Sequence, residues 1–214
     1  MIALVTCISA RDLDADLPPL VDALDALGVP SRVVAWDDPP HDWSDVDLVV
    51  LRSTWNYHDR VDVFLDWVRS VDAVAPVWNR PETVVANTDK RYLERFAAAG
   101  IPTTPTRFVA AADLAGEVPT LDDRDLVGDV IVKPAVGAGS NGVGRFVDDP
   151  GAARRHISAL HDVGDTAMIQ PYLAEVDQRG ETGLVYFGGR FSHAFRKAAI
   201  FAGEPDFSLG LYAA

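Results

Sequence analysis

A glycine-rich stretch, VKPAVGAGSNGVG over residues 132–144, holds residue types well suited to binding phosphate. Glycine lets backbone N–H groups come close to phosphate oxygens, and a nearby lysine supplies a compact positive charge. Lys133 stands just before the glycines. The pattern therefore predicts a phosphate-binding loop lined by Gly137, Gly139, Ser140, Asn141 and Gly142. The alternative is a mobile hairpin in which Lys133 protects a strand edge from pairing with another chain.

The same glycines also fit the G-x-G-x-x-G spacing of dinucleotide-binding folds. In those folds a helix opens at the last glycine, whereas here the run GRFV predicts a strand after Gly142. A Walker loop is excluded as well, because Val143 stands where its lysine would be. A dinucleotide-binding oxidoreductase is therefore a remote alternative, and it requires a helix directly after Gly142.

Lysine is rare in this chain, which has sixteen arginines but only Lys90, Lys133 and Lys197. Lys90 falls in the first turn of a predicted helix, NTDKRYLERFAAAG, that Asn87 or Thr88 would cap. A helix dipole disfavours a cation at that end and attracts an anion. We therefore expect an anionic ligand beside Lys90, with a solvated lysine as the alternative.

The composition predicts a globular protein, since 48% of the 214 residues are hydrophobic. Its net charge of -13 argues against binding to nucleic acid or to anionic membranes. Cys7 is the single cysteine, so the chain has no disulfide framework, and we expect Cys7 in the core. The chain has no apolar run of about 18 residues and no basic leader, which favours a cytoplasmic protein.

The first half of the chain alternates apolar strands with helical patterns, which predicts a parallel, doubly wound α/β domain over residues 1–85. Ligands of such sheets bind beyond the carboxyl ends of the strands. Two of these ends carry hydrogen-bonding and aromatic groups that could face a substrate: Arg52, Trp55, Asn56, Tyr57 and Asn79. A well-capped surface loop is the alternative. Trp36, Trp43 and Trp67 are expected in the core or in an interface.

The second half predicts an antiparallel α+β region. Six strand-like runs surround one clear helix, DPGAARRHISALH, and Gly188-Gly189 predicts a hairpin turn. The acidic residues 116–129 predict a surface connection. We expect His156 and His161 on a solvated helix face. His193 is expected on one side of a strand with Phe191 and Phe195, half-buried and hydrogen-bonded, with a place in the binding cleft as the alternative.

Four segments in this order carry a resemblance: NTDK, VIVKPAVGAGSNGVGRF, MIQPYL and GETGLVYFGGRFSHAFRK. Together they resemble the ATP-grasp superfamily of D-alanine:D-alanine ligases, glutathione synthetases and ribosomal-protein glutamate ligases. The segments LRSTWNYHDR and VWNRPETVVANTDKRYL are most similar to the O-ureido-serine cyclo-ligase group within it. The resemblance implies a pre-ATP-grasp domain at 1–85, an ATP-grasp subdomain at 86–170 and the start of a second lobe at 171–214.

The resemblance also implies a chemistry, in which ATP phosphorylates a carboxylate and an amine attacks the acyl phosphate. Lys90, Lys133 and the glycine-rich loop would hold the ATP phosphates. Adenine would meet the backbone near Gln170, at Tyr172 or Leu173, because Pro171 has no N–H to donate. Glu181 would bind the ribose, with Glu175 and Asp177 as alternatives. Arg196 and Lys197 would be catalytic, stabilising charge at the transferred phosphoryl group.

Family members bind Mg²⁺ through acidic and Asn residues on later strands. Only Glu204 and Asp206 follow Lys197 as carboxylates, so we expect the metal ligands beyond residue 214 and a truncated chain. The predicted function is an ATP-dependent carboxylate–amine ligase for a small amino-acid-like substrate, with ring closure as one version. An ATP-binding module without catalysis is the alternative. A homodimer is implied by the resemblance alone.

Overall fold

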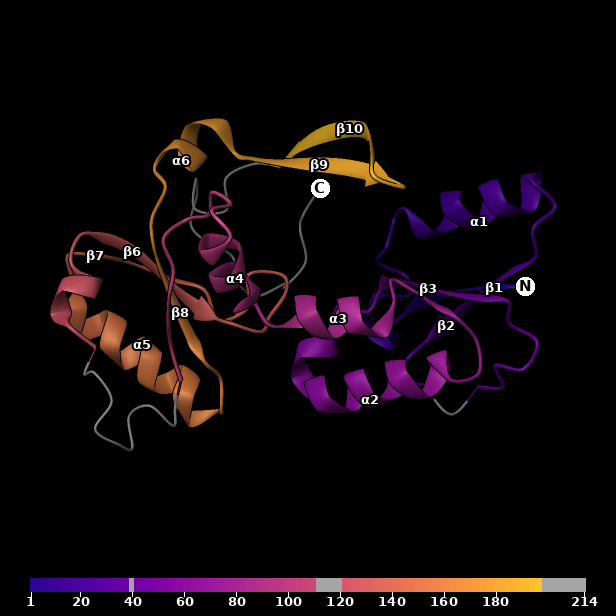
Figure 1. Ribbon diagram of the computed structural model, residues 1–214, viewed down its shortest axis with the longest axis horizontal. Helices are drawn as coiled ribbons and strands as arrows, with labels where there is room; N and C mark the ends of the chain where they lie inside the picture. Colours follow the sequence, from indigo (N-terminus) through magenta and orange to yellow (C-terminus); the bar gives the residue numbers. More distant parts are fainter. Residues whose placement is uncertain (39–40, 111–120, 198–214) are drawn as a thin grey trace. The chain divides into compact units, whose positions relative to one another are not determined.

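The computed structural model describes residues 1–38, 41–110 and 121–197, and the chain divides into two compact units (Figure 1). The first unit holds Met1–Ala99 together with the short segment Val136–Ala138. The second holds Gly100–Ala135 and the described residues from Gly139 onward. In the described part of the chain, no helix combines the length and the apolarity needed to cross a lipid bilayer.

The first unit is built on a parallel sheet in the order β2-β1-β3-β4. Its strands are β1 (Ile2–Thr6), β2 (Ser31–Ala35), β3 (Leu48–Ser53) and β4 (Val77–Trp78). Two helices, α1 (Leu17–Ala26) and α2 (Val61–Asp72), lie on opposite sides of this sheet (Figure 1). Short 3-10 turns occupy Ile8–Ala10 and Tyr57–Arg60. The predicted doubly wound arrangement is confirmed.

Aromatic rings fill much of the core of the first unit. Trp36 and Phe64 are buried and meet edge to face at 5.1 Å, while Trp67 stacks on Phe64 at 5.9 Å. Trp43 packs against Trp67, so the three tryptophans predicted for the core or an interface all join the core. Cys7 is fully buried among apolar residues, which confirms its predicted role.

The single helix predicted after residue 86 is wrong. Two helices stand in its place, α3 (Pro81–Thr88) and α4 (Tyr92–Ala98). Asp89 is extended at φ −101° and ψ 120°, and its carboxylate accepts hydrogen bonds from the backbone N and the Nε of Arg91 at 2.9 and 2.8 Å. Those bonds hold the chain out of the helical path. Asn87 and Thr88 therefore end α3, and Lys90 lies in the link rather than in a first turn.

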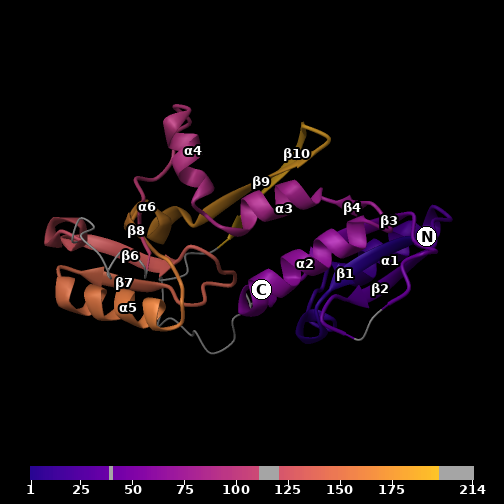
Figure 2. The same ribbon diagram turned by 60° about the horizontal axis from the view of Figure 1, so that its bottom comes forward.

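The second unit is built on an antiparallel sheet in the order β5-β8-β6-β7. Its strands are β5 (Arg107–Val109), β6 (Asp129–Pro134), β7 (Gly144–Val147) and β8 (Ala167–Pro171). The predicted helix is α5 (Pro150–Asp162), which lies along one face of this sheet in both Figure 1 and Figure 2. Asp149 caps α5 by accepting a hydrogen bond from the N–H of Ala152 at 2.8 Å.

The core of the second unit takes in residues that the sequence assigned to a surface connection. Leu121 and Leu126 are buried against Ile157 and Leu160 of α5. Leu126 belongs to a 3-10 turn, Asp123–Leu126, that its acidic neighbours concealed in the sequence. The described end of that connection is therefore part of the core, which corrects the prediction.

A hairpin of β9 (Glu181–Phe187) and β10 (Arg190–Lys197) follows a short helix α6 (Glu175–Arg179) that the sequence did not predict. Gly188 and Gly189 form its turn with positive φ values of 55° and 75°, as predicted. The pairing shifts register between Phe191 and His193. The prediction that these two side chains share one side of the strand is therefore wrong, and His193 is exposed rather than half-buried.

Candidate functional site

Strand alternation places Lys133 on the face of the second sheet opposite α5. Val132 is fully buried in the core that α5 covers, so the side chain of Lys133 points to the other face. In the register of β6 and β8, Lys133 pairs with Met168 and Ile131 pairs with Gln170. Because directly paired residues share a face, these four side chains form one surface, here called the Lys133 face.

The ammonium group of Lys133 is set in a low-dielectric environment. Its burial lowers the pKa of Lys133, and the negative charge of Glu181 acts in the opposite direction. Lys197 of β10 stands directly opposite Glu181 of β9 in the hairpin register. Glu181 therefore lies within electrostatic reach of Lys133 and directly across the hairpin from Lys197. An anion bound at the Lys133 face would favour the charged form of Lys133, which burial disfavours.

The chain leaving β8 separates the two candidates for an adenine contact. The backbone N–H of Tyr172 donates to the carbonyl oxygen of Asp129 at 2.8 Å and is occupied. Among the residues that the structure describes, the N–H of Leu173 has no hydrogen-bond partner. Gln170 is held in place, because its side-chain amide donates to Thr106 Oγ1 at 2.8 Å. The geometry thus favours Leu173 over Tyr172 as a backbone donor.

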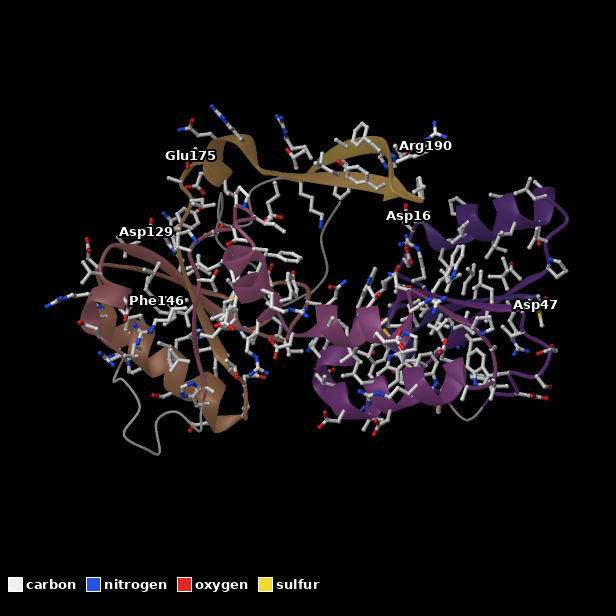
Figure 3. The ribbon with its side chains drawn as sticks, in the orientation of Figure 1. Asp16, Asp47, Asp129, Phe146, Glu175 and Arg190 are labelled. Carbon is white, nitrogen blue, oxygen red and sulfur yellow. The ribbon has the colours of Figure 1, made fainter. Side chains whose placement is uncertain are left out.

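Arg145 fixes this same segment from β7. Its guanidinium bonds both carboxylate oxygens of Asp129, at 2.9 and 2.6 Å, and lies 3.5 Å from the centre of the Tyr172 ring. Asp177 accepts from the Tyr172 hydroxyl and lies 3.7 Å from Arg145. Figure 3 labels Asp129 in β6 and Glu175 in α6. Asp177, one of the three carboxylates predicted as ribose contacts, is therefore engaged within the protein.

The glycine-rich loop joins β6 to β7 and has a left-handed backbone at three residues. Gly139, Ser140 and Gly142 have φ values of 61°, 62° and 69°. The N–H of Val143 donates to the carbonyl oxygen of Ser140 at 3.2 Å and closes a turn with Gly142 at its third position, where a positive φ favours glycine. The strand β7 follows at once, so the helix required by a dinucleotide-binding loop does not occur.

The segment Val136–Ala138 at the start of this loop belongs to the first unit. The carbonyl oxygen of Gly137 accepts from Lys90 Nζ at 3.0 Å and lies 3.5 Å from the Tyr57 hydroxyl. Burial raises the pKa of Tyr57, with a further contribution from Tyr92, so the hydroxyl keeps its proton. Two residues predicted for different roles, Lys90 for phosphate and Tyr57 for substrate, therefore meet at the same peptide group.

The other residues predicted to face a substrate differ in how they are held. Arg52 donates to Asp14 at 3.1 Å and to Asp16, labelled in Figure 3, at 2.9 Å. Asn56 accepts from Trp36 Nε1 and donates to Asp37, both at 2.7 Å, which commits its amide to the fold. Trp55 is 37% exposed and Asn79 is exposed. The exposed pair is available for a ligand.

Comparisons with known proteins identify the family. A family model described as the N-terminal domain of D-cycloserine synthetase DcsG matches residues 2–79. The cycloserine biosynthesis protein DcsG of Streptomyces lavendulae is 36% identical over 205 residues, which cover 94% of this chain and 68% of that protein. The chain belongs to the DcsG family.

Solved structures agree with this assignment. The crystal structure of D-cycloserine synthetase DcsG matches at a TM-score of 0.83 and 35% identity, covering 93% of this chain and 68% of that one. D-alanine–D-alanine ligase from Bacillus anthracis complexed with ATP matches at 0.61 and 15%, covering 94% and 67%. A RimK domain ATP-grasp protein from Sphaerobacter thermophilus matches at 0.56 and 20%, covering 80% and 63%. The last two show the fold alone, and the predicted ATP-grasp fold is confirmed.

The two residues predicted as catalytic in this DcsG-family chain lie next to each other in β10. Arg196 is exposed, and Lys197 is partly buried with its ammonium 5.8 Å from the centre of the Phe195 ring. Successive strand residues point to opposite faces, so their side chains do not converge. Within the described residues, no group of three His, Cys, Asp or Glu side chains could hold a metal ion. Glu204 and Asp206 lie outside the described residues.

Three polar residues of this DcsG-family chain were missed by reasoning from the sequence. Arg145 ties three segments together, Asp14 is buried against Arg52, and His156 donates to the glycine-rich loop. His161, predicted on a solvated face like His156, is also half-buried and bonded, to the carbonyl oxygen of Val109. The helical spacing of Ala153, His156 and Leu160 places His156 near the apolar stripe, which is the signal that could have found it.

Proposed function

We propose that this chain binds ATP on the Lys133 face and serves in an ATP-dependent carboxylate–amine ligase. The observation that carries the proposal is the half-buried Lys133 within electrostatic reach of Glu181. A Leu173 N–H that no described group engages lies at the Asp129 end of the β6–β8 strand pair that carries Lys133. A lysine kept in low dielectric gains most from an anion, and a triphosphate is a strong one. Membership of a family that includes D-cycloserine synthetase supports the same conclusion.

In this proposal different residues hold different parts of ATP. Leu173 donates its N–H to the adenine edge, and Glu181 accepts from the ribose. Lys133 and the loop residues Gly139, Ser140, Asn141 and Gly142 bind phosphate oxygens. Lys90 and Gly137, which belong to the first unit and bond each other there, stay phosphate contacts predicted from the sequence. The D-alanine–D-alanine ligase that shares this fold was solved with ATP, which supports a nucleotide site here.

The proposed reaction has two steps. A substrate carboxylate oxygen attacks the terminal phosphorus of ATP, and the bond to ADP breaks. An amine nitrogen then attacks the acyl carbon, phosphate leaves, and the nitrogen loses a proton to form an amide. One of the two residues predicted as catalytic, Arg196 or Lys197, would stabilise the charge that develops on the transferred group, since their side chains lie on opposite faces of β10. Such ligases use Mg²⁺, but the described residues do not supply a ligand set, so no step is assigned to a metal here.

The proposed substrate is small and amino-acid-like. Trp55 and Asn79 are exposed and could contact it directly, while Arg52, Asn56 and Tyr57 shape the loop that presents them. DcsG is named for cycloserine synthesis, so ring closure of an O-ureido-serine is the version we propose to test first. A cytoplasmic location, a homodimer, and domain boundaries at residues 85 and 170 stay predictions from the sequence.

The test is release of ADP with Mg·ATP and a panel of substrates, including O-ureido-serine, using the full-length gene product. We expect ADP and one amide product in equal amounts. Calorimetric binding of ATP without turnover would favour the alternative of a non-catalytic ATP-binding module. Binding of NAD but not ATP would favour the oxidoreductase, although the strand after Gly142 already speaks against it.

A further inference from the structure

His156 of α5 is hydrogen-bonded to the glycine-rich loop. Its Nε2 lies 2.9 Å from the carbonyl oxygen of Gly142. A carbonyl oxygen only accepts hydrogen bonds, so the proton must be on Nε2 and the histidine is the donor. This bond links the helix on one face of the second sheet to the loop predicted to bind phosphate.

The same peptide group is held from both ends. The carbonyl of Gly142 is bonded by His156, and the N–H of the same peptide unit, carried by Val143, donates to the carbonyl oxygen of Ser140. Because a peptide unit is planar, two such bonds fix its orientation. The C-terminal arm of the loop therefore has a set direction where it enters β7.

Packing around this bond depends on two glycines. A Cβ on Gly142 would lie 3.0 Å from Pro134 Cδ, and one on Gly144 would lie 2.7 Å from the Phe146 ring and 3.3 Å from His156 Cδ2. The rings of His156 and Phe146 are 5.5 Å apart, and Figure 3 labels Phe146 in β7. The backbone thus comes close enough for the histidine ring to reach its carbonyl.

We propose that His156 is a positioning residue for nucleotide binding, which holds the glycine-rich loop by donating its Nε2–H to Gly142. The role rests on the proposed ATP site and adds a residue that does not itself touch the nucleotide. Without the bond, the Gly142–Val143 peptide can rotate, and the N–H groups of the loop lose a common direction toward phosphate. Ordering the loop then costs part of the binding free energy.

The test uses one loss-of-donor variant, one rescue and one control. His156→Phe keeps a ring against Phe146 but removes the donor. His156→Gln retains an N–H donor on a flexible chain of similar reach. His161→Phe removes the corresponding bond, from His161 Nε2 to the carbonyl oxygen of Val109 at 2.9 Å, on the same helix but away from the loop.

Two readouts are compared. In nucleotide-free protein, hydrogen exchange of the Val143 and Gly144 amides should be about three- to tenfold faster in His156→Phe, the range expected for one neutral hydrogen bond. ATP affinity should fall by a similar factor. His156→Gln should recover most of both effects. His161→Phe should change neither, even if it lowers the thermal midpoint of unfolding as much as His156→Phe does.

Unchanged loop exchange in His156→Phe, or no recovery in His156→Gln, would overturn the proposal. Equal weakening of ATP binding by His156→Phe and His161→Phe would also overturn it, because general loss of stability would then explain both. The exchange measurement needs no nucleotide. If wild-type protein binds no ATP while its loop exchange still depends on His156, the proposed function and the nucleotide role of His156 fail together, and only the loop contact stands.

Discussion

The two sheets of this protein carry their polar residues in different places. The parallel sheet of the first unit has helices on both sides, and polar residues gather at the carboxyl end of β3, where Arg52 is the penultimate residue of the strand and Asn56 follows it. The antiparallel sheet of the second unit has α5 along one face and carries Lys133 on the opposite face, one residue before the end of β6. In the first unit the polar groups thus gather at the end of a strand, whereas in the second unit a lysine lies on a sheet face where its neighbours Ile131 and Met168 are buried.

The largest expected effect tests whether the two cores are separate. Leu4 on the central strand β1 and Leu126 beside α5 are both buried. Leu4→Ala should cost about 2–5 kcal/mol of unfolding free energy. All five tryptophans lie in the first unit, so urea unfolding followed by tryptophan fluorescence should move to lower urea in Leu4→Ala and stay unchanged in Leu126→Ala. Far-UV circular dichroism should detect the loss in Leu126→Ala. Equal shifts of the fluorescence transition would contradict the separation.

The second effect concerns ligand binding on the Lys133 face. Lys133→Ala should weaken ATP binding by about 1.5–3 kcal/mol, the range for a hydrogen bond to a charged group, as measured by calorimetry. Arg124→Ala is the matched control, because it removes a positive charge from the same unit at a side chain that is 91% exposed. Unchanged ATP affinity in Lys133→Ala, or an equal loss of affinity in Arg124→Ala, would mean that ATP does not bind on the Lys133 face.

The third effect concerns the loop after β3 in the first unit. Asn56→Ala removes the acceptor of the buried Trp36 indole N–H and should lower the unfolding free energy by about 1–2 kcal/mol, followed by tryptophan fluorescence. Ser70→Ala removes an exposed hydroxyl in α2 and should change stability by less than about 0.5 kcal/mol. If both variants unfold alike, the loop is held by other contacts.

The smallest effect is the dependence on pH. Burial places the pKa of Lys133 below its ordinary value of 10.5, so between the two pKa values the unfolded chain binds more protons and stability rises with pH. Lys133→Met should be more stable than wild type at neutral pH, and this difference should shrink as the pH approaches 10.5. Urea unfolding followed by circular dichroism at several pH values measures it. A difference that is constant with pH would contradict a depressed pKa.

Much of the fold could be predicted from the sequence, because apolar runs and helix-ending glycines are local signals. The strands of both sheets and the helices α1, α2 and α5 were found in this way. The break at Asp89 was not, since it depends on how one carboxylate bonds Arg91. The burial of Leu126 was hidden by charged neighbours, and the register shift after Phe191 depends on pairing with another strand.

The candidate site was predictable in part for the same reason. Lys133 and the glycines stood out by residue type and spacing, which a sequence displays directly. The choice between Tyr172 and Leu173 required knowing that the N–H of Tyr172 pairs with Asp129, 43 residues earlier in the chain. Likewise, only the folded chain brings His156 to Gly142.

The central claim is that ATP binds on the Lys133 face, and photolabelling tests it most directly. Full-length protein is irradiated with 8-azido-ATP and the labelled peptides are identified by mass spectrometry. We expect the label on β6, residues 129–134, or on β8 and the two residues after it, residues 167–173. Excess ATP should prevent this labelling. Displaceable label on α5, or none at all, would contradict the claim.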